Sequence, residues 1–324
     1  MVAMTSESIE RYKTLGRALR LTGGRLEVVV TLDVGPRTMH VSLPGGPNMF
    51  ADECPLKEEL PDGTAFEYLG GHRVWHSPEA FPRSYVPDRH PLARHELYDD
   101  GILMVQQEEP WTHIVKAVEF RFGEGSVAVT SSLTNNGAWP IEMAVWSPFL
   151  GSPNGRLILP VTLRNTGLLP NTSYVLWPYA RMDDPRVHWG RRFIVLDHDK
   201  HAETQFKLGY PNELGWLAYV NHGCCLVKRF VHERGARYPD GGCSSEAYTA
   251  GWGIDIESLS PLRQVRPGET ITHEEQWSVF DCPARPSIDD DEIAAALAPF
   301  AQRAGFELPV PSVEAWDPTR DQKA

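Results

Sequence analysis

Short apolar segments with a period of two, separated by glycine, proline and asparagine turns, follow one another along most of this chain. The clearest is RLEVVVTLDV at residues 25–34, in which alternate positions from Leu26 to Leu32 are apolar. About fifteen such strands are predicted, and their spacing is typical of a β-sandwich or a barrel. No alternation of strands with helices is present, so an all-β fold of antiparallel strands is expected.

A single domain accounts for most of the chain. We expect an N-terminal extension at 1–24, in which a short amphipathic helix is one option, and one β-sandwich domain at 25–282. The segment GEG at 123–125 is predicted to join two strands as a hairpin. Residues 283–324 are predicted to form a short helix that ends at Gly305, with Ser287 or Asp289 as its N-cap, and a polar tail.

Composition excludes several classes of function. The net charge of −12 disfavours nucleic acid as a partner. No signal peptide or membrane-spanning segment is predicted, and five cysteines without a CxxC pair favour a reduced, cytoplasmic setting. No nucleotide-binding motif, serine-nucleophile motif or zinc-ligand spacing is present, so neither a cofactor nor a metal is predicted.

The segment GGHRVWHSPEAFPRSYVPDRHPLARH at residues 70–95 is the first candidate binding region. It contains four of the twelve histidines, four arginines and several aromatic residues, and four prolines predict a long irregular loop. Flat rings suit the C–H faces of a sugar, while Arg, His and Glu side chains suit its hydroxyls. The alternative is a surface loop with solvated charges. The candidate residues are His72, Arg73, Trp75, His76, Glu79 and Arg83.

Two later strands add further candidates. In Lys228-Arg229-Phe230 one of the two cations is expected to face a cleft, although lysine is also common on solvated edge strands. The second strand contains Glu246 and Tyr248, which are further candidates for binding the substrate.

Glu257 is the candidate general base. It shares a strand face with Asp255 and Leu259, which suggests that this face is not simply solvent-exposed. A carboxylate on a half-buried face has a raised pKa and is a better base near neutral pH. The alternative is that Glu257 only pairs with a nearby arginine.

Several motifs resemble the galactose mutarotase-like (aldose 1-epimerase) superfamily, and they are most similar to a branch known only as a domain of unknown function. They are RLEVVVTLDVGPRTMHVSLPGGPNMF, GGHRVWHSPE, SSLTNNGAWPIEMAVW, YVLWPY and GIDIESLSPLRQVRPGETITHEEQW, spread over roughly residues 25–280. The resemblance implies an antiparallel β-supersandwich with the sugar on its concave face. It also implies that Glu257 takes the proton of the anomeric hydroxyl while a histidine protonates the ring oxygen.

The chain departs from the family at that histidine. The family places it shortly after an Asn-x-Gly turn, but here Asn135-Asn136-Gly137 is followed by Trp146 and Ser147. His72, or else His76, is the expected substitute from the 70–95 segment.

The first functional hypothesis is therefore a carbohydrate-active isomerase of aldose 1-epimerase type, with Glu257 as base and His72 as acid. Arg73, Arg83 and Lys228 or Arg229 are expected to make the cleft basic, which favours a sugar acid or a phosphorylated sugar. The alternatives are a non-catalytic sugar-binding or sensing protein, and a lyase or hydrolase on the same scaffold. The residues expected to bind substrate are Arg73, Trp75, His76, Glu79, Arg83, Lys228, Glu246 and Tyr248.

Overall fold

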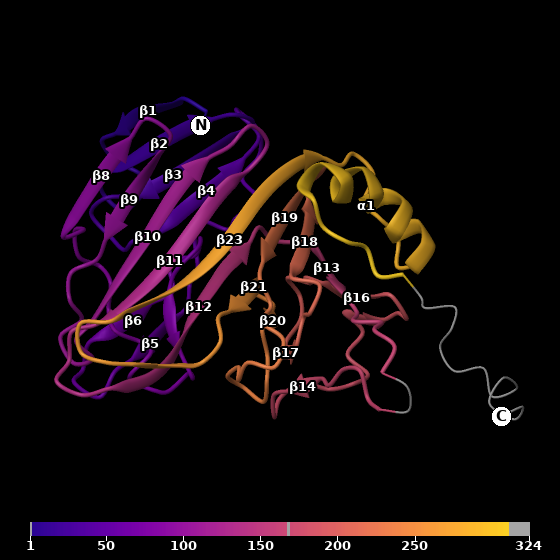
Figure 1. The fold of residues 1–324 in the computed structure, drawn as a ribbon. Coiled ribbons are helices and arrows are strands. Elements are labelled where there is room, and N and C mark those ends of the chain that lie inside the picture. The colour runs from indigo at the N-terminus through magenta and orange to yellow at the C-terminus, as the bar shows by residue number, and fades with distance from the viewer. Residues whose placement is uncertain (1, 167–168, 311–324) are drawn as a thin grey trace, which may run out of the picture.

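The computed structural model describes residues 2–166 and 169–310, and it consists almost entirely of antiparallel strands (Figure 1). This confirms the prediction of an all-β antiparallel sandwich. The largest sheet has ten strands, in the order β15 (Val187–Trp189), β16 (Phe193–Asp197), β13 (Arg156–Pro160), β18 (Trp216–Asn221), β19 (Cys224–Phe230), β23 (Thr270–Asp281), β11 (Val127–Asn135), β10 (Ile114–Phe122), β9 (Gly101–Val105) and β8 (Arg94–Tyr98).

A seven-stranded sheet lies against the first. Its strands are β14 (Val175–Leu176), β17 (Phe206–Tyr210), β20 (Ser245–Ala250), β21 (Gly253–Leu259), β12 (Ile141–Gly151) and β22 (Arg263–Val265), with β7 (Trp75–Ser77) paired to β12. Two smaller sheets complete the fold: β1 (Met4–Ile9), β2 (Ala18–Gly23), β3 (Leu26–Thr31) and β4 (Thr38–Ser42) form one, and β5 (Lys57–Glu59) and β6 (Ala65–Glu67) form the other.

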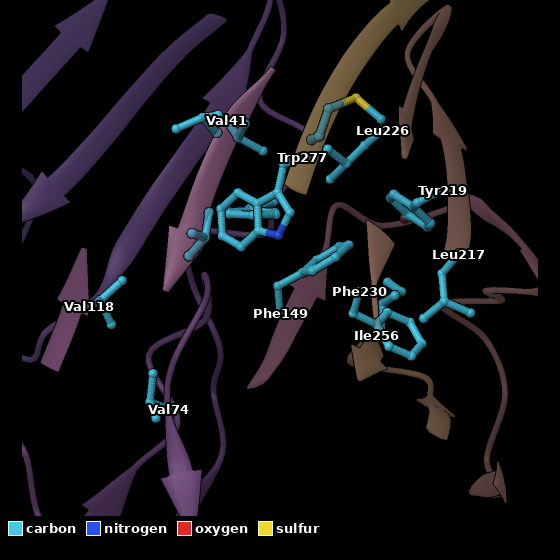
Figure 2. Close-up of a cluster of buried hydrophobic side chains, with 14 of the residues drawn as sticks. Val41, Val74, Val118, Phe149, Leu217, Tyr219, Leu226, Phe230, Ile256 and Trp277 are labelled. Atoms are coloured by element: carbon cyan, nitrogen blue, oxygen red, sulfur yellow. The ribbon is translucent and has the colours of Figure 1, made fainter. Parts of the chain in front are cut away.

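The main core lies between the sheets and has aromatic side chains at its centre. Trp277 on β23 meets Phe120, Phe50 and Phe149 at ring-centroid distances of 5.7, 5.6 and 6.4 Å, each edge to face. Figure 2 shows Trp277 directed at Phe149 of β12, with Ile256 of β21 beyond it. Such pairs add about 0.5–1.5 kcal/mol each to the free energy gained from burial.

The seven-stranded sheet is unusual because β21 is buried along its whole length and β12 along nearly all of it. One face of these strands contributes Phe149 and Ile256 to the main core. The other face is covered by segments that precede β8, and it carries a separate apolar cluster of Leu60, Phe66, Trp75, Trp146 and Leu259. A sheet covered on both sides can hold side chains away from water on either face.

The C-terminal helix was predicted correctly. It is α1 (Asp290–Ala304), drawn in yellow in Figure 1, and Asp289 caps it by accepting hydrogen bonds from the backbone of Asp291 and Glu292. Gly305 ends it with a φ of 70°, a conformation that favours glycine. The part of the predicted tail at 311–324 lies outside the described residues. No helix in the described part of the chain is long and apolar enough to cross a membrane.

Two segments differ from expectation. Residues 1–24 contain no helix in their described part; instead β1 and β2 extend the sheet of β3, because Leu19 and Leu21 belong to the core. The start of the 70–95 segment is not an irregular loop either. Its first proline is Pro78, and before it His72 is bridged to Phe149 and β7 is paired to β12. Only the proline-rich remainder, up to β8, is irregular.

Candidate functional site

A pocket of about 300 Å³ lies on the face of the seven-stranded sheet that points away from the main core. Its floor comes from β12, β17, β20 and β21, and its walls come from the segments around β5 to β7 and from residues 177–179 and 252. The lining residues are Leu56, Glu58, Tyr68, Arg73, Trp75, Glu79, Tyr85, Trp146, Trp177, Tyr179, Gln205, Lys207, Tyr248, Trp252, Asp255 and Glu257.

Glu257 lies on the floor of this pocket and is almost fully buried, with 2% of its surface exposed. One of its oxygens, Oε2, accepts a hydrogen bond from the indole N–H of Trp146 at 2.8 Å and another from Nζ of Lys207 at 3.2 Å. Burial raises the pKa of the Glu257 carboxyl, and the charge of Lys207 opposes this only in part. Glu257 is therefore held in place and binds a proton more readily than an exposed glutamate does.

A second carboxylate shares the same lysine. Glu246 is directly opposite Glu257 in the register of β20 and β21, and Nζ of Lys207 lies 2.6 Å from its Oε2. Burial raises the pKa of Glu246 well above its ordinary value; Lys207 lowers it, and the neighbouring charge of Glu257 raises it further. Two buried carboxylates therefore share one ammonium in this group, the Lys207 cluster (Lys207, Glu246 and Glu257), and a single positive charge does not fully compensate both.

The conformation of Lys207 is fixed by more than its ion pairs. Its Nζ lies 4.9 Å from the ring centroid of Trp146 and 4.5 Å from that of Trp177. Gly209, two residues along β17, is opposite Glu246, and an added Cβ there would come within 3.1 Å of Cγ of Glu246. The glycine therefore leaves room for the carboxylate beside the lysine.

Arg73 forms a second ion pair in the pocket. Two of its nitrogens donate to the two carboxylate oxygens of Asp255 at 3.0 and 3.1 Å, and both side chains are buried. Its guanidinium also stacks over the ring of Trp75, 4.6 Å from the centroid. This arrangement is rigid, and it directs an aromatic face and a fixed pair of charges at the pocket.

Aromatic rings form most of the pocket wall. Four tryptophans and four tyrosines line it, and neighbouring rings touch: Trp75 and Tyr85 have centroids 5.3 Å apart, and Tyr248 and Trp252 have centroids 5.5 Å apart. Such rings cover the apolar faces of a ligand, while tyrosine hydroxyls and carboxylates bind its polar groups.

Six of the ten predicted site residues are brought together here. Arg73, Trp75, Glu79, Tyr248 and Glu257 line the pocket. Glu246 lies directly behind Lys207.

His72 does not belong to the pocket, so the geometry gives no support to its predicted role as the acid. It is fully buried on the core side, where its Nε2 is 2.8 Å from the hydroxyl of Ser147 and its ring meets Trp277 edge to face. Burial lowers the pKa of His72 to about 3, so it is neutral near neutral pH. The reason is strand alternation, because Arg73 faces the pocket and its neighbour His72 must face the other way.

Three other predicted residues are also elsewhere. His76 lies 3.6 Å from Glu109 and lines a different hollow together with Arg83. Lys228 is on β19 in the ten-stranded sheet and pairs with Glu275 at 2.8 Å. The pocket is therefore not basic, contrary to the prediction.

Sequence reasoning missed Lys207. The available signal was weak: a single lysine between Phe206 and Leu208 in an apolar strand. What gives Lys207 its importance is the register that brings β17, β20 and β21 together, and strand register across distant segments is not readable from one sequence.

Comparison with known proteins gave matches only among solved structures. No family model matches the chain, and no curated protein matches it. A candidate aldose 1-epimerase from Klebsiella pneumoniae is 11% identical with a TM-score of 0.57, and the match covers 97% of this chain and 92% of that one. A galactose mutarotase-like protein from Lactobacillus casei is 10% identical with a TM-score of 0.51, covering 85% of this chain and 100% of that one.

A candidate mutarotase from Salmonella typhimurium is similar to the same degree, with 10% identity, a TM-score of 0.50 and coverage of 86% and 94%. At such low identities the likeness concerns the fold and not the activity. The resemblance inferred from the sequence motifs is confirmed at that level. The chain has the galactose mutarotase-like fold.

Proposed function

We propose that the pocket binds a sugar in its ring form and catalyses exchange between its two anomers, as an isomerase of aldose 1-epimerase type. The observation that carries the proposal is the position of Glu257. It is a buried carboxylate with a raised pKa on the floor of an aromatic pocket, at the end of two fixed hydrogen bonds. A group tuned in this way is suited to general base catalysis near neutral pH.

In the proposed reaction Glu257 removes the proton from the anomeric hydroxyl. The bond between C1 and the ring oxygen breaks, a carbonyl forms at C1, and the ring oxygen takes a proton. Rotation about the C1–C2 bond followed by the reverse steps closes the ring as the other anomer. Both proton transfers are reversed on closure, so no cofactor is needed.

Lys207 is proposed to stabilise the negative charge on the ring oxygen as the ring opens, and that oxygen then takes its proton from water. Lys207 lines the pocket, its ammonium is 3.2 Å from the base, and no histidine is among the described residues that line this pocket. Burial lowers the pKa of Lys207, but the charges of Glu246 and Glu257 together raise it well above its ordinary value. The ammonium is therefore fully charged, and it stabilises the alkoxide that develops as the ring opens.

The remaining predicted residues have proposed roles in binding. Trp75 and Tyr248 cover the faces of the sugar ring, and Glu79 at the pocket mouth accepts hydrogen bonds from hydroxyls. Arg73 keeps Asp255 and Trp75 in position.

The test is the rate of anomer exchange by NMR, measured over a panel of hexoses with the native protein and with Glu257→Gln. Loss of a positioned base is expected to slow exchange by about 10²–10⁴-fold, while binding and melting temperature change little. Exchange at the native rate in Glu257→Gln would contradict the proposal. Glu59→Gln is the matched control, because Glu59 is exposed and does not line the pocket.

A second candidate function is sugar binding without turnover. It is favoured because no histidine follows the Asn135-Asn136-Gly137 turn, where the resemblance implies the acid, and Trp146 and Ser147 stand there instead. Binding of a hexose with no acceleration of anomer exchange would support this function and overturn the isomerase.

A further inference from the structure

The charge of the pocket points to a particular class of ligand. Its described lining has two cations and four carboxylates: Arg73 and Lys207 against Glu58, Glu79, Asp255 and Glu257. Both cations are already engaged, Arg73 by Asp255, and Lys207 by Glu246 and Glu257. No uncompensated positive charge is therefore left in this lining for an acidic ligand.

Two of the carboxylates lie at the mouth of the pocket. Glu58 on β5 and Glu79 beyond β7 are exposed, and each is near a tyrosine hydroxyl: Tyr68 donates to Glu58 at 3.5 Å, and Tyr85 donates to Glu79. Within 2–166 and 169–310, neither carboxylate has a lysine, arginine or histidine in ion-pair contact. A pocket mouth that carries carboxylates without paired cations concentrates ligands of positive charge.

The charge of Glu79 also reaches the pocket floor. Burial lowers the pKa of Lys207, and the charges that raise it come from Glu246, Glu257 and then Glu79. Glu79 is thus near enough to a group at the centre of the pocket to interact with it, and an ammonium on a bound ligand would experience the same attraction.

The aromatic wall favours cations as well. The protein's own cations already occupy ring faces: Arg73 lies over Trp75, and Lys207 lies over Trp177 and Trp146. Four further rings of the wall have no cation over them in the described residues, namely Tyr85, Tyr179, Tyr248 and Trp252. Cages of aromatic rings with nearby carboxylates are how proteins bind ammonium groups.

We propose that the preferred ligand of this pocket is a sugar with a positive charge, a hexose with a free amino group. Its ring would occupy the aromatic pocket, and its ammonium would bind between the mouth carboxylates and the unoccupied ring faces. This proposal rests on the proposed function only in that the ligand is a sugar. An amino sugar replaces the acidic sugar that was expected from the sequence.

The first experiment compares the affinities of glucose, glucosamine, N-acetylglucosamine and glucuronate by titration calorimetry at about pH 6, where the amine is protonated. Glucosamine is expected to bind about tenfold tighter than glucose, N-acetylglucosamine no tighter than glucose, and glucuronate most weakly. Added salt should shrink the advantage of glucosamine, since the mouth carboxylates are exposed to solvent.

The second experiment uses the double variant Glu58→Gln with Glu79→Gln, and its readout is the ratio of the glucosamine and glucose affinities. That ratio should fall toward one, whereas Glu59→Gln, which removes the same charge from the neighbouring position of β5, should leave it unchanged. A ratio that persists in the double variant would overturn the proposal.

The outcomes separate this inference from the proposed function. Glucose or glucuronate binding at least as tightly as glucosamine, with anomer exchange accelerated, overturns the charged ligand and leaves the isomerase standing. Absence of binding by all four sugars overturns both.

Discussion

Two buried lysines approach the seven-stranded sheet from opposite sides, Lys207 from β17 of that sheet and Lys228 from β19 of the ten-stranded sheet, and the number of carboxylates around them differs. Lys207 faces the pocket and Lys228 faces the main core, and each has a glutamate within an ion pair, at 2.6 Å for Glu246 and 2.8 Å for Glu275. Lys228 also donates to the backbone oxygen of Ser147, the residue next to Trp146. The two groups are therefore separated by little more than the thickness of β12 and β21.

The difference is the number of carboxylates. Among the described residues, Glu275 is the one carboxylate that forms an ion pair with Lys228. It also accepts hydrogen bonds from the hydroxyl of Ser258 and the indole of Trp277. Burial alone would raise the pKa of Glu275, but the charge of Lys228, followed by His273 and His72, lowers it to about 2. In the Lys207 cluster two carboxylates share one cation, and the pKa of each is raised.

A buried ion pair is therefore not in itself a sign of function. The pair of Lys228 and Glu275 is buried in the core, where burial lowers the pKa of Lys228 and the charge of Glu275 offsets this only in part. The Lys207 cluster is unbalanced, with two carboxylates for one ammonium, and it opens onto the pocket. The two groups differ in the number of carboxylates per lysine and in whether they open onto the pocket. Each group can be tested by removing one carboxylate.

The largest expected effect is on stability. Glu275→Gln leaves Lys228 without a carboxylate inside the core, and this should lower the free energy of unfolding by about 3–5 kcal/mol. Glu257→Gln leaves Lys207 paired with Glu246, so its cost should be much smaller. Urea denaturation of the two variants measures the difference. Equal losses would show that the two groups are both structural.

A smaller effect is expected in the pH dependence of stability. The raised pKa of Glu257 in the folded state means that its contribution is present at low pH and is lost as the pH rises through the raised value. Glu257→Gln should therefore become more stable relative to the native protein as the pH increases from about 4 to 8. For Glu275 the sign is opposite, because its lowered pKa gives stability that is lost only as the pH falls toward about 2.

This pH profile is read from melting temperatures of both proteins in matched buffers. A constant offset between native protein and Glu257→Gln across the range would mean that the pKa of Glu257 is the same in the folded and unfolded states. The unbalanced description of the Lys207 cluster would then be incorrect.

The smallest effect is expected at His72. Glutamine at this position can still hydrogen-bond to Ser147, and because His72 faces the core, His72→Gln should change anomer exchange by less than about twofold. A modest loss of stability, about 1 kcal/mol, is expected from the altered packing against Trp277. A drop in exchange rate as large as that of Glu257→Gln would restore His72 as the acid.

Much of the fold was predictable because it depends on local patterns. Alternation gave the strands, turn residues gave the hairpin at 123–125, and capping residues gave α1. Glu257 could also be recognised as a candidate site residue, because it shares a strand face with Asp255. In each case the signal lies within a few consecutive residues.

What escaped prediction depends on pairing between distant segments. Nothing local says that Glu246 is opposite Glu257 or that Lys207 reaches both. The choice of His72 together with Arg73 illustrates a further error, because neighbours in an extended segment cannot both face one pocket. That argument would have applied as soon as the residues from His72 to the end of β7 were recognised as pairing with β12.

The double coverage of β21 has a consequence for how such a protein can evolve. Its odd positions, among them Asp255 and Glu257, belong to the pocket, and its even positions, among them Ile256, belong to the core. Point substitutions at the odd positions can change ligand preference without disturbing the interior, so the two faces can diversify independently. Insertion or deletion of one residue would exchange the faces and bury the carboxylates in the core, so length changes in this strand should be eliminated by selection even where substitutions are frequent.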